Sequence, residues 1–201
     1  AVVKEIAGDP EGEARIKVVI HTLDPQGKGT WARLATLDAG NERGTFFLPE
    51  VGDEVLAGFI NEDPRDAVIL GMLHSSKLKP PLTATQDNHE KGLVTRSKLK
   101  LMFDDDKEVI TLETPGGNLM TISDEAKGLE LKDQNGNTLT LDDKGITLKS
   151  AKDITLEATG KVNVKATQDA SVEGMNLNLK AQAQFKAEGS AGAEVSTSAV
   201  A

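Results

Sequence analysis

A short phrase of alternating apolar and polar residues repeats through the second half of the chain, and it restricts the possible folds strongly. Each phrase has four residues with apolar side chains at its first and third positions, as at residues 110–113 and 154–157. Eleven such phrases follow one another up to Ser196. Their first residues are 7 to 10 residues apart, and the spacing stays close to 8 after Ile146. A sustained short period indicates a repetitive β-structure instead of a single globular core.

The size of the unit sets a second constraint. Alternation with a period of two places both apolar side chains of a phrase on the same face of a strand. Burying two aliphatic side chains does not offset the entropy lost when the whole unit is ordered, so one unit is unstable alone. Each unit therefore needs hydrogen-bonded strands on both sides and an apolar surface opposite its own.

Three architectures meet this requirement: a single-chain β-helix, an antiparallel meander, and three copies of the chain wound together as a triangular prism. A single-chain helix with three units per turn would have fewer than four turns, and we expect strand lengths in a meander to vary more. We therefore predict an intertwined triple-stranded β-helix in a homotrimer. The residues of its predicted core are Ile110, Leu112, Ile146, Leu148, Ile154, Leu156, Val162, Val164, Val172, Leu177 and Leu179.

The first half has a different pattern, which is typical of a small β-barrel. Between residues 13 and 73, short apolar runs alternate with turns rich in Gly, Pro and Asp. Strands are expected at residues 16–20, 31–35, 46–48, 54–60 and 67–71. Five strands at roughly 10-residue spacing predict an all-β domain such as an OB-fold. The expected barrel core consists of Trp31, Phe47, Val55, Phe59 and Ile69.

The distribution of aromatic residues and charge supports a division of the chain. Phe185 is the only aromatic residue after Phe103, and residues 101–201 carry a net charge of −7 against −2 for residues 1–100. Aromatic rings do not fit a core only a few side chains wide. The predicted domains are an OB-fold barrel at 1–75, a linker or neck at 76–108, and a β-helical needle at 109–201.

Composition excludes several functional classes. The chain has no Cys, so disulfides, thiolate catalysis and Cys-ligated zinc are ruled out. A net charge of −9 argues against a general nucleic-acid-binding protein, which needs a basic face. The chain begins at Ala1 without an apolar leader, so we expect no signal peptide, and we expect a processed chain or a piece of a longer protein.

Residues with catalytic or metal-binding chemistry are scattered along the chain. The three histidines stand singly, at His21, His74 and His89. The adjacent carboxylates of Asp104, Asp105 and Asp106 are expected in a solvated turn. Residues 133–137 are similar to the start of a calcium loop, but Lys144 occupies the twelfth position, where a bidentate Glu is required. We expect a polar turn there, and we expect no enzymatic activity, no cofactor and no bound metal.

The dense run between Trp31 and Phe59, which includes the sequence FLPEVGDEVLAGF, resembles spike proteins of contractile injection systems. Further matching segments are Asp63-Pro64-Arg65, Ile69-Leu70-Gly71, Thr95-Arg96-Ser97 and Phe103-Asp104-Asp105. This family includes VgrG of type VI secretion, the spikes of extracellular phage-tail-like particles and the central spike of contractile phage tails. The resemblance implies an OB-fold followed by an intertwined triple-stranded β-helix.

The resemblance also implies a function. Such a homotrimer caps the tail tube, sits in the baseplate and pierces the envelope of a target cell. Its implied partners are tail-tube and baseplate proteins, a PAAR-repeat tip protein and effector cargo, with no nucleic acid. It would assemble in the bacterial cytoplasm and then be delivered outside or into the target cell. Family members usually carry a large hub before the OB-fold, so we expect this chain to be a C-terminal portion or a shortened spike.

Two other functional classes remain open at this point. One is a binding module resembling a tail fibre, in which the barrel recognises glycan or nucleic acid and the repeats form a stalk. Aromatic residues such as Trp31 and Phe59 offer stacking surfaces, but they lie in apolar-patterned strands of near-balanced charge. The other is an enzyme, such as a cell-wall hydrolase, whose active domain lies outside this sequence.

Overall fold

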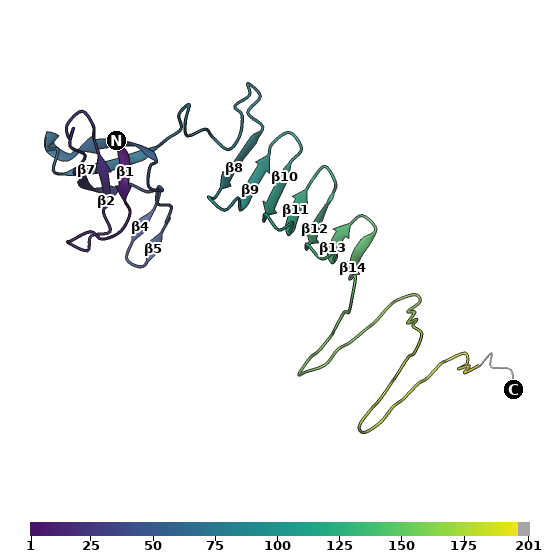
Figure 1. Ribbon diagram of the computed structural model, residues 1–201. Helices are drawn as coiled ribbons and strands as arrows, with labels where there is room; N and C mark the ends of the chain where they lie inside the picture. The colour runs from purple at the N-terminus through teal and green to yellow at the C-terminus, as the bar shows by residue number, and fades with distance from the viewer. Residues whose placement is uncertain (197–201) are drawn as a thin grey trace. The chain divides into compact units, whose positions relative to one another are not determined.

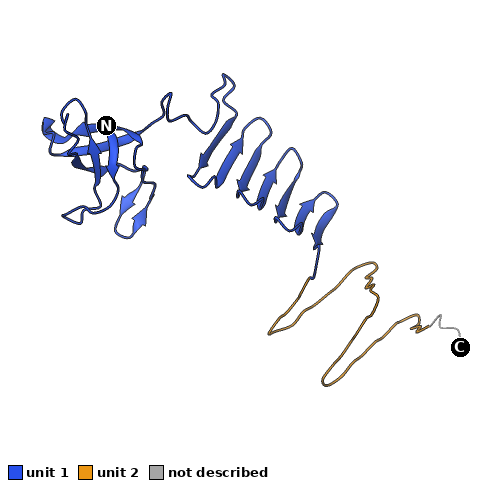
Figure 2. Cartoon of the chain, in the orientation of Figure 1, with its two compact units in different colours: residues 1–153 blue, residues 154–201 orange. Residues whose placement is uncertain are grey.

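The structure is a computed structural model in which residues 1–196 are described, so the last five residues of the predicted needle lie outside it. The chain divides into one unit at residues 1–153 and a second that begins at Ile154 (Figure 2). The first unit holds all the strands described, and the fold is all-β as predicted.

A closed five-stranded barrel forms from the N-terminal residues (Figure 1). Its strands follow the order β1-β2-β3-β7-β6, in which β3 and β7 are parallel and the other neighbours are antiparallel. The strands are β1 (Val2–Glu5), β2 (Ile16–Val19), β3 (Thr30–Leu34), β6 (Glu54–Phe59) and β7 (Ala67–Leu73). A 3-10 helix, η1 (Ile60–Glu62), lies between β6 and β7.

The barrel core is small and aliphatic. Its buried residues are Val3, Ile16, Val18, Ala32, Val55, Ala67 and Ile69. They come from all five strands because alternate side chains of each strand point inward. Of the predicted core residues, Val55 and Ile69 are fully buried and Phe59 packs against the cluster while partly exposed.

The structure corrects two predicted core residues and one strand. Trp31 is only half-buried, with Lys17 Nζ 5.4 Å from the centroid of its ring. Phe47 is 60% exposed, and no strand forms at residues 46–48. The fifth strand of the barrel is instead β1, which lies inside the predicted domain at 1–75 but before residues 13–73, where the strands were expected. Even in a strand, Phe46 and Phe47 could not both face the interior of the barrel, since neighbouring side chains of a strand point to opposite faces of the sheet.

Residues 35–53 form the crossover between β3 and β6. They contain a short hairpin, β4 (Ala39–Gly40) and β5 (Arg43–Gly44). Pro49 is buried at the end of this crossover. The backbone then returns to the barrel, where the N–H of Gly52 donates to the carbonyl of Val3 at 2.9 Å.

A seven-stranded antiparallel sheet follows, with its strands in chain order from β8 to β14 (Figure 1). Every strand has five residues. The strands are β8 (Glu90–Val94), β9 (Lys100–Asp104), β10 (Val109–Glu113), β11 (Leu119–Ser123), β12 (Gly128–Lys132), β13 (Thr138–Asp142) and β14 (Gly145–Lys149).

This sheet differs from the prediction in two respects. Within one chain, the phrases up to Lys149 form an antiparallel meander whose strands all have the same length. The expectation that strand lengths in a meander vary more was therefore wrong. Successive turns of similar length keep the strands equal, because each turn fixes the register of the next hairpin. The sheet also includes β8 and β9, which lie in the segment predicted as a linker at 76–108. That linker is therefore shorter than predicted.

Residues 154–196 have no helix or strand. Their apolar side chains are exposed, including Leu156 at 81% and Val164 at 87%. The repeated phrases in residues 154–196 are here called the octad repeats. Because a strand requires a neighbour for its backbone hydrogen bonds, a single copy leaves the octad repeats unpaired.

Candidate functional site

The candidate site is one face of the seven-stranded sheet, which is here called the apolar face. The strand register aligns its side chains in two rows that run across the strands. The first row consists of Leu93, Leu101, Leu112, Met120, Leu131, Leu139 and Leu148. The second row consists of Phe103, Ile110, Ile122, Leu129, Leu141 and Ile146. Each four-residue phrase thus lies within one strand, and its two apolar side chains lie beside the apolar side chains of the neighbouring strands.

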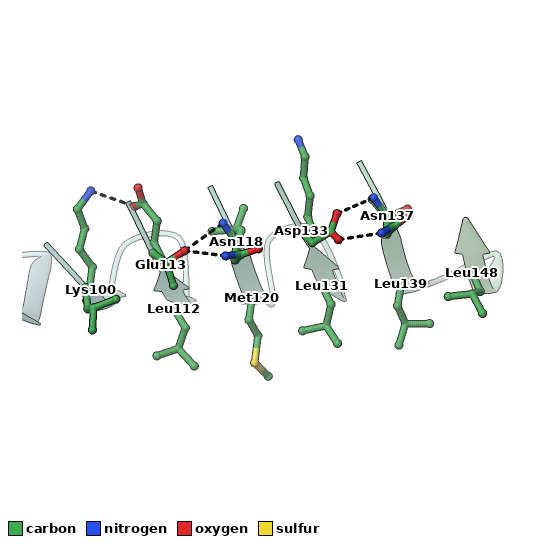
Figure 3. A pocket seen from close by; sticks show the side chains of 15 residues that line it. Lys100, Leu112, Glu113, Asn118, Met120, Leu131, Asp133, Asn137, Leu139 and Leu148 are labelled. Carbon is green, nitrogen blue, oxygen red and sulfur yellow. Dashed lines mark hydrogen bonds and ion pairs between the residues drawn. The ribbon is translucent and has the colours of Figure 1, made fainter. Parts of the chain in front are cut away.

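The apolar face is open to solvent in a single copy. Leu112 is 46% exposed, Leu148 is 57% exposed and Ile146 is 75% exposed. Figure 3 shows Leu112, Met120, Leu131, Leu139 and Leu148 extending from the strands in the same direction, along a shallow groove. A contiguous apolar surface that spans a whole sheet is characteristic of an interface with another macromolecule.

The opposite face of the same sheet is polar. Thr111, Thr121, Glu130, Thr140 and Thr147 are aligned across neighbouring strands in the middle position of each phrase. An ion pair between Lys100 Nζ and Glu113 Oε2, 3.0 Å apart, joins β9 to β10 (Figure 3). Alternation of an apolar with a polar face is the pattern of an antiparallel sheet that is covered on one side only.

Two asparagines organise the turns at one end of the strands. The Asn118 side chain donates from Nδ2 to Thr114 Oγ1 at 3.0 Å within the β10–β11 turn (Figure 3). Its Oδ1 accepts the backbone N–H of Gln134, in the β12–β13 turn, at 3.3 Å. Asn137 repeats this arrangement, since its Nδ2 donates to Asp133 Oδ2 at 2.8 Å. Each asparagine therefore fixes the shape of its own turn and also contacts a second one.

The segment similar to a calcium loop forms the β12–β13 turn, as the sequence predicted. Asp133 accepts hydrogen bonds from the side chain and backbone of Asn135 and of Asn137. These donors lower the pKa of Asp133 to about 2, from an ordinary value of 3.8. Its carboxylate oxygens are thus used by the turn itself. Within residues 1–196, no group of three or more His, Asp or Glu side chains is placed to hold a metal ion.

The other acidic residues that the sequence singled out also serve in turns. Asp104 Oδ1 accepts the backbone N–H groups of Asp106 and Lys107, each at 3.1 Å. The hydrogen bond from Lys107 is the main cause of the lowered pKa of Asp104. Asp105 forms an ion pair with Lys91 of β8. The three adjacent carboxylates therefore lie in the β9–β10 turn region, as expected.

Further ion pairs hold loops of the barrel. Asp9 accepts from Nε and Nη2 of Arg15, the closest contact being 2.7 Å, and from three backbone N–H groups of the β1–β2 loop. The Arg15 guanidinium is the main cause of a pKa of Asp9 well below its usual range. Asp63 accepts from Arg65 in the loop after η1, which lowers the pKa of Asp63 to about 2. Both pairs order the chain locally.

The predicted trimer-core residues fall into two groups. Ile110, Leu112, Ile146 and Leu148 lie on the apolar face. The others belong to the unpaired octads and are exposed: Ile154, Leu156, Val162, Val164, Val172, Leu177 and Leu179. That both groups are buried in one core is a prediction about the trimer.

The prediction omitted the start of the apolar face. Leu93, Leu101 and Phe103 extend its two rows into β8 and β9. A signal was present, because residues 101–103 form an apolar run that is followed by a turn. The neighbouring prolines and polar residues at 79–90 concealed that signal.

Two family models match the chain. A model of the type VI secretion system/phage-baseplate injector OB domain matches residues 1–74, which contain the barrel. A model of the phage baseplate V C-terminal trimerisation domain matches residues 108–168. The first match confirms the predicted OB-fold. The second includes β10 to β14 and continues into the repeats that follow, so it covers the first group of predicted trimer-core residues and, of the second group, Ile154, Leu156, Val162 and Val164.

One curated relative is similar over much of the chain. It is the actin cross-linking toxin VgrG1 of Vibrio cholerae serotype O1 (strain ATCC 39541 / Classical Ogawa 395 / O395), which is 26% identical over 155 residues. The aligned region is 75% of this chain but only 13% of the relative. The toxin activity in that name refers to a far longer protein.

Proposed function

This chain belongs to the VgrG-like spike proteins of type VI secretion systems and phage baseplates, and we propose that three copies form a piercing spike. The apolar face carries this proposal, because it is exposed in one copy and lies largely within the match to a trimerisation domain. The proposed spike has a barrel at 1–75, a short neck and a β-structured needle formed by the repeats that follow.

Three apolar faces that turn toward one axis would form the walls of a prism. Each row across a sheet would then meet the corresponding rows of two other copies. Aliphatic side chains suit such a narrow core better than aromatic rings, and Phe103 is the only aromatic residue in the two rows. Threonines and charged residues on the opposite face would remain in water, which keeps the assembled shaft soluble.

The octad repeats would form the continuation of the shaft. In one copy, residues 154–196 have no strand partners and expose their aliphatic side chains. Winding three copies together supplies both missing elements, namely neighbouring strands and an apolar core. Folding and trimerisation of this region would therefore be a single event.

The work of the spike would be mechanical. We infer that it caps the tail tube, sits in the baseplate and crosses the target envelope when a sheath contracts. A tip protein of the PAAR-repeat class and effector cargo are its proposed additional partners. Assembly in the bacterial cytoplasm and delivery outside or into the target cell follow from this role. No helix within residues 1–196 has the length and apolar character needed to cross a membrane.

We propose a structural, non-enzymatic role for these residues. The charged clusters described above are engaged in turns and loops, and both matched family models are baseplate domains. The activity named for the Vibrio cholerae relative concerns a protein of which 13% is matched.

Solution mass of the full chain tests this function. Light scattering should give a particle three times the 21.3 kDa mass of one copy, and the trimer should survive SDS without boiling. A monomer at micromolar concentration would contradict the intertwined shaft. For comparison, affinity of the isolated OB-fold for oligonucleotide or glycan would favour the binding-module alternative.

A further inference from the structure

The two ends of the strands in the seven-stranded sheet carry opposite charge. Successive turns of the meander lie alternately at one end and at the other (Figure 1). One end, here called the basic edge, carries six basic and three acidic side chains over residues 94–100, 113–119, 132–138 and 149–153. The other end, here called the acidic edge, carries nine acidic and three basic side chains over Glu90 and residues 104–109, 123–128 and 142–145.

Part of the charge at the basic edge has no compensation within one copy. Glu113 is paired with Lys100, and the carboxylate of Asp133 is used by its own turn. Lys132 and Lys149 are exposed, and within residues 1–196 their ammonium groups form no ion pair. The register places these two lysines in the same row, two strands and about 10 Å apart. Their like charges repel each other in a single copy.

The acidic edge has the same excess with the opposite sign. Asp104 is paired with Lys107. Asp124 and Glu125 in the β11–β12 turn are exposed, as is Asp143 in the β13–β14 turn. In the part of the chain that the structure describes, none of these three carboxylates forms an ion pair. A surface of opposite charge would therefore relieve the repulsion at either edge.

The dimensions of the sheet indicate what each edge meets in the trimer. A five-residue strand spans about 17 Å, whereas seven strands stacked about 4.8 Å apart extend about 29 Å. The two apolar rows follow the longer direction, which leads on to the octad repeats, so this direction is the axis of the proposed prism. The strand ends then form the two vertical borders of each wall. A three-fold rotation joins the walls head to tail, so each basic edge meets the acidic edge of the next copy at the same height.

We propose that the basic edge of each copy forms ion pairs with the acidic edge of its neighbour, along the three corners of the trimer. The proposal rests on the trimer described above and names the charged contacts that join its walls. Lys132 ends β12 at the height of the β11–β12 turn, which holds Asp124 and Glu125. Lys149 ends β14 at the height of the β13–β14 turn, which holds Asp143.

These corner contacts would also select parallel copies. Inverting one copy while its apolar face still points to the axis exchanges the positions of its two edges. Two basic edges would then meet at one corner and two acidic edges at another. Complementary charge at all three corners is therefore possible only when every barrel lies at the same end of the shaft.

Charge reversal in the full chain tests the corner contacts. Within one copy, Lys132 and Asp124 are separated by the length of a strand, about 13 Å or more. This separation exceeds the Debye length of about 8 Å at physiological salt, so an energetic coupling between the two residues reports a contact across copies. Lys132→Glu should lower the urea concentration at which the trimer dissociates, measured by light scattering at physiological salt. Adding Asp124→Lys should recover at least half of that loss.

Glu62→Lys provides the matched control for this recovery. Glu62 is exposed in η1 of the barrel, outside the sheet. Lys132→Glu combined with Glu62→Lys has the same net charge as Lys132→Glu combined with Asp124→Lys, and it should recover none of the loss. Equal recovery by Glu62→Lys and Asp124→Lys would overturn the corner contacts while the natural chain remains trimeric. A monomeric mass for the natural chain would overturn both proposals.

Neutral variants decide the outcome if the reversed chain does not assemble. Lys132→Gln and Asp124→Asn each remove one member of the proposed pair without adding repulsion. The combined loss in the urea midpoint should then be smaller than the sum of the two separate losses. Losses that add up fully would show that the two edges do not touch in the trimer.

Discussion

Asn137 Oδ1 accepts a hydrogen bond from Ser150 Oγ at 2.8 Å, and the same oxygen accepts the backbone N–H of Ala151 at 3.2 Å. Asn118 makes the equivalent contact to Gln134 one hairpin earlier. The turns at one end of the sheet are therefore joined to one another, in addition to the hydrogen bonds between strands. This arrangement fixes the direction in which the chain leaves β14.

Replacing either linking asparagine should destabilise the sheet. Asn137→Ala removes the bonds to Asp133, Ser150 and Ala151, and a net hydrogen bond contributes about 0.5–1.5 kcal/mol. We expect a loss of about 1–2 kcal/mol per chain in the free energy of unfolding, and a smaller loss for Asn118→Ala. Urea unfolding followed by circular dichroism at a fixed protein concentration measures this difference.

Asn41→Ala provides the control for these variants. Asn41 lies in the turn between β4 and β5, and within residues 1–196 its side chain makes no hydrogen bond. We expect a change of less than about 0.5 kcal/mol, as for most surface substitutions. Equal losses for Asn41→Ala and Asn137→Ala would show that the links between turns contribute nothing specific.

A charge on the apolar face should prevent assembly. Leu131→Asp would place three carboxylates together in the core of the proposed prism, where unpaired charge is strongly unfavourable. We expect complete loss of the trimer by light scattering. Thr111→Asp is the matched control, because Thr111 lies on the opposite face of the same sheet, and this variant should remain trimeric. Trimerisation of both variants would mean that the apolar face is not the interface.

The sequence was sufficient to predict the all-β fold and much of the pattern of apolar residues. Val55 and Ile69 are in the barrel core, and Leu112 and Leu148 share one row of the sheet. Strict alternation carries this information, since it fixes which side chains share a face. It carries no information about whether the neighbouring strand belongs to the same chain.

The misassigned elements have local physical explanations. β1 contains only four residues, VVKE, and pairs with β2 and also with β6, which is distant in sequence. Phe47 is of a residue type that is common in cores, but residues 46–48 form no strand and its side chain is exposed. Neither effect leaves a periodic signal in the sequence.

Acid should weaken the β12–β13 turn. The pKa of Asp133 is lowered to about 2 in the folded chain from an ordinary value of 3.8, so its carboxylate stabilises the fold. This contribution is complete above the unfolded value and is lost as pH falls through the folded value. We expect the difference in melting temperature between the natural chain and Asp133→Asn to be constant near neutrality and to shrink between about pH 4 and pH 2.

Thr114→Val is the control that distinguishes protonation of the Asp133 carboxylate from the loss of a turn hydrogen bond that does not depend on pH. Thr114 Oγ1 accepts from Asn118 in the β10–β11 turn, which is equivalent in position but has no titrating acceptor. Its destabilisation, measured as a melting-temperature difference by circular dichroism, should therefore be the same at pH 6 and at pH 2.5. A difference for Asp133→Asn that does not change over this range would refute the proposed role of its carboxylate.

The octad repeats offer the sharpest test of the shaft beyond β14. Leu156 is 81% exposed in one copy, yet its place in the alternation predicts that it faces the axis of the trimer. Leu156→Asp should therefore abolish the SDS-resistant trimer, because three charges would share one layer of the core. Thr155→Asp, one residue away and on the other face of the predicted strand, should leave the trimer intact. If Thr155→Asp alone disrupted assembly, the opposite face of the octads would be the one that points inward.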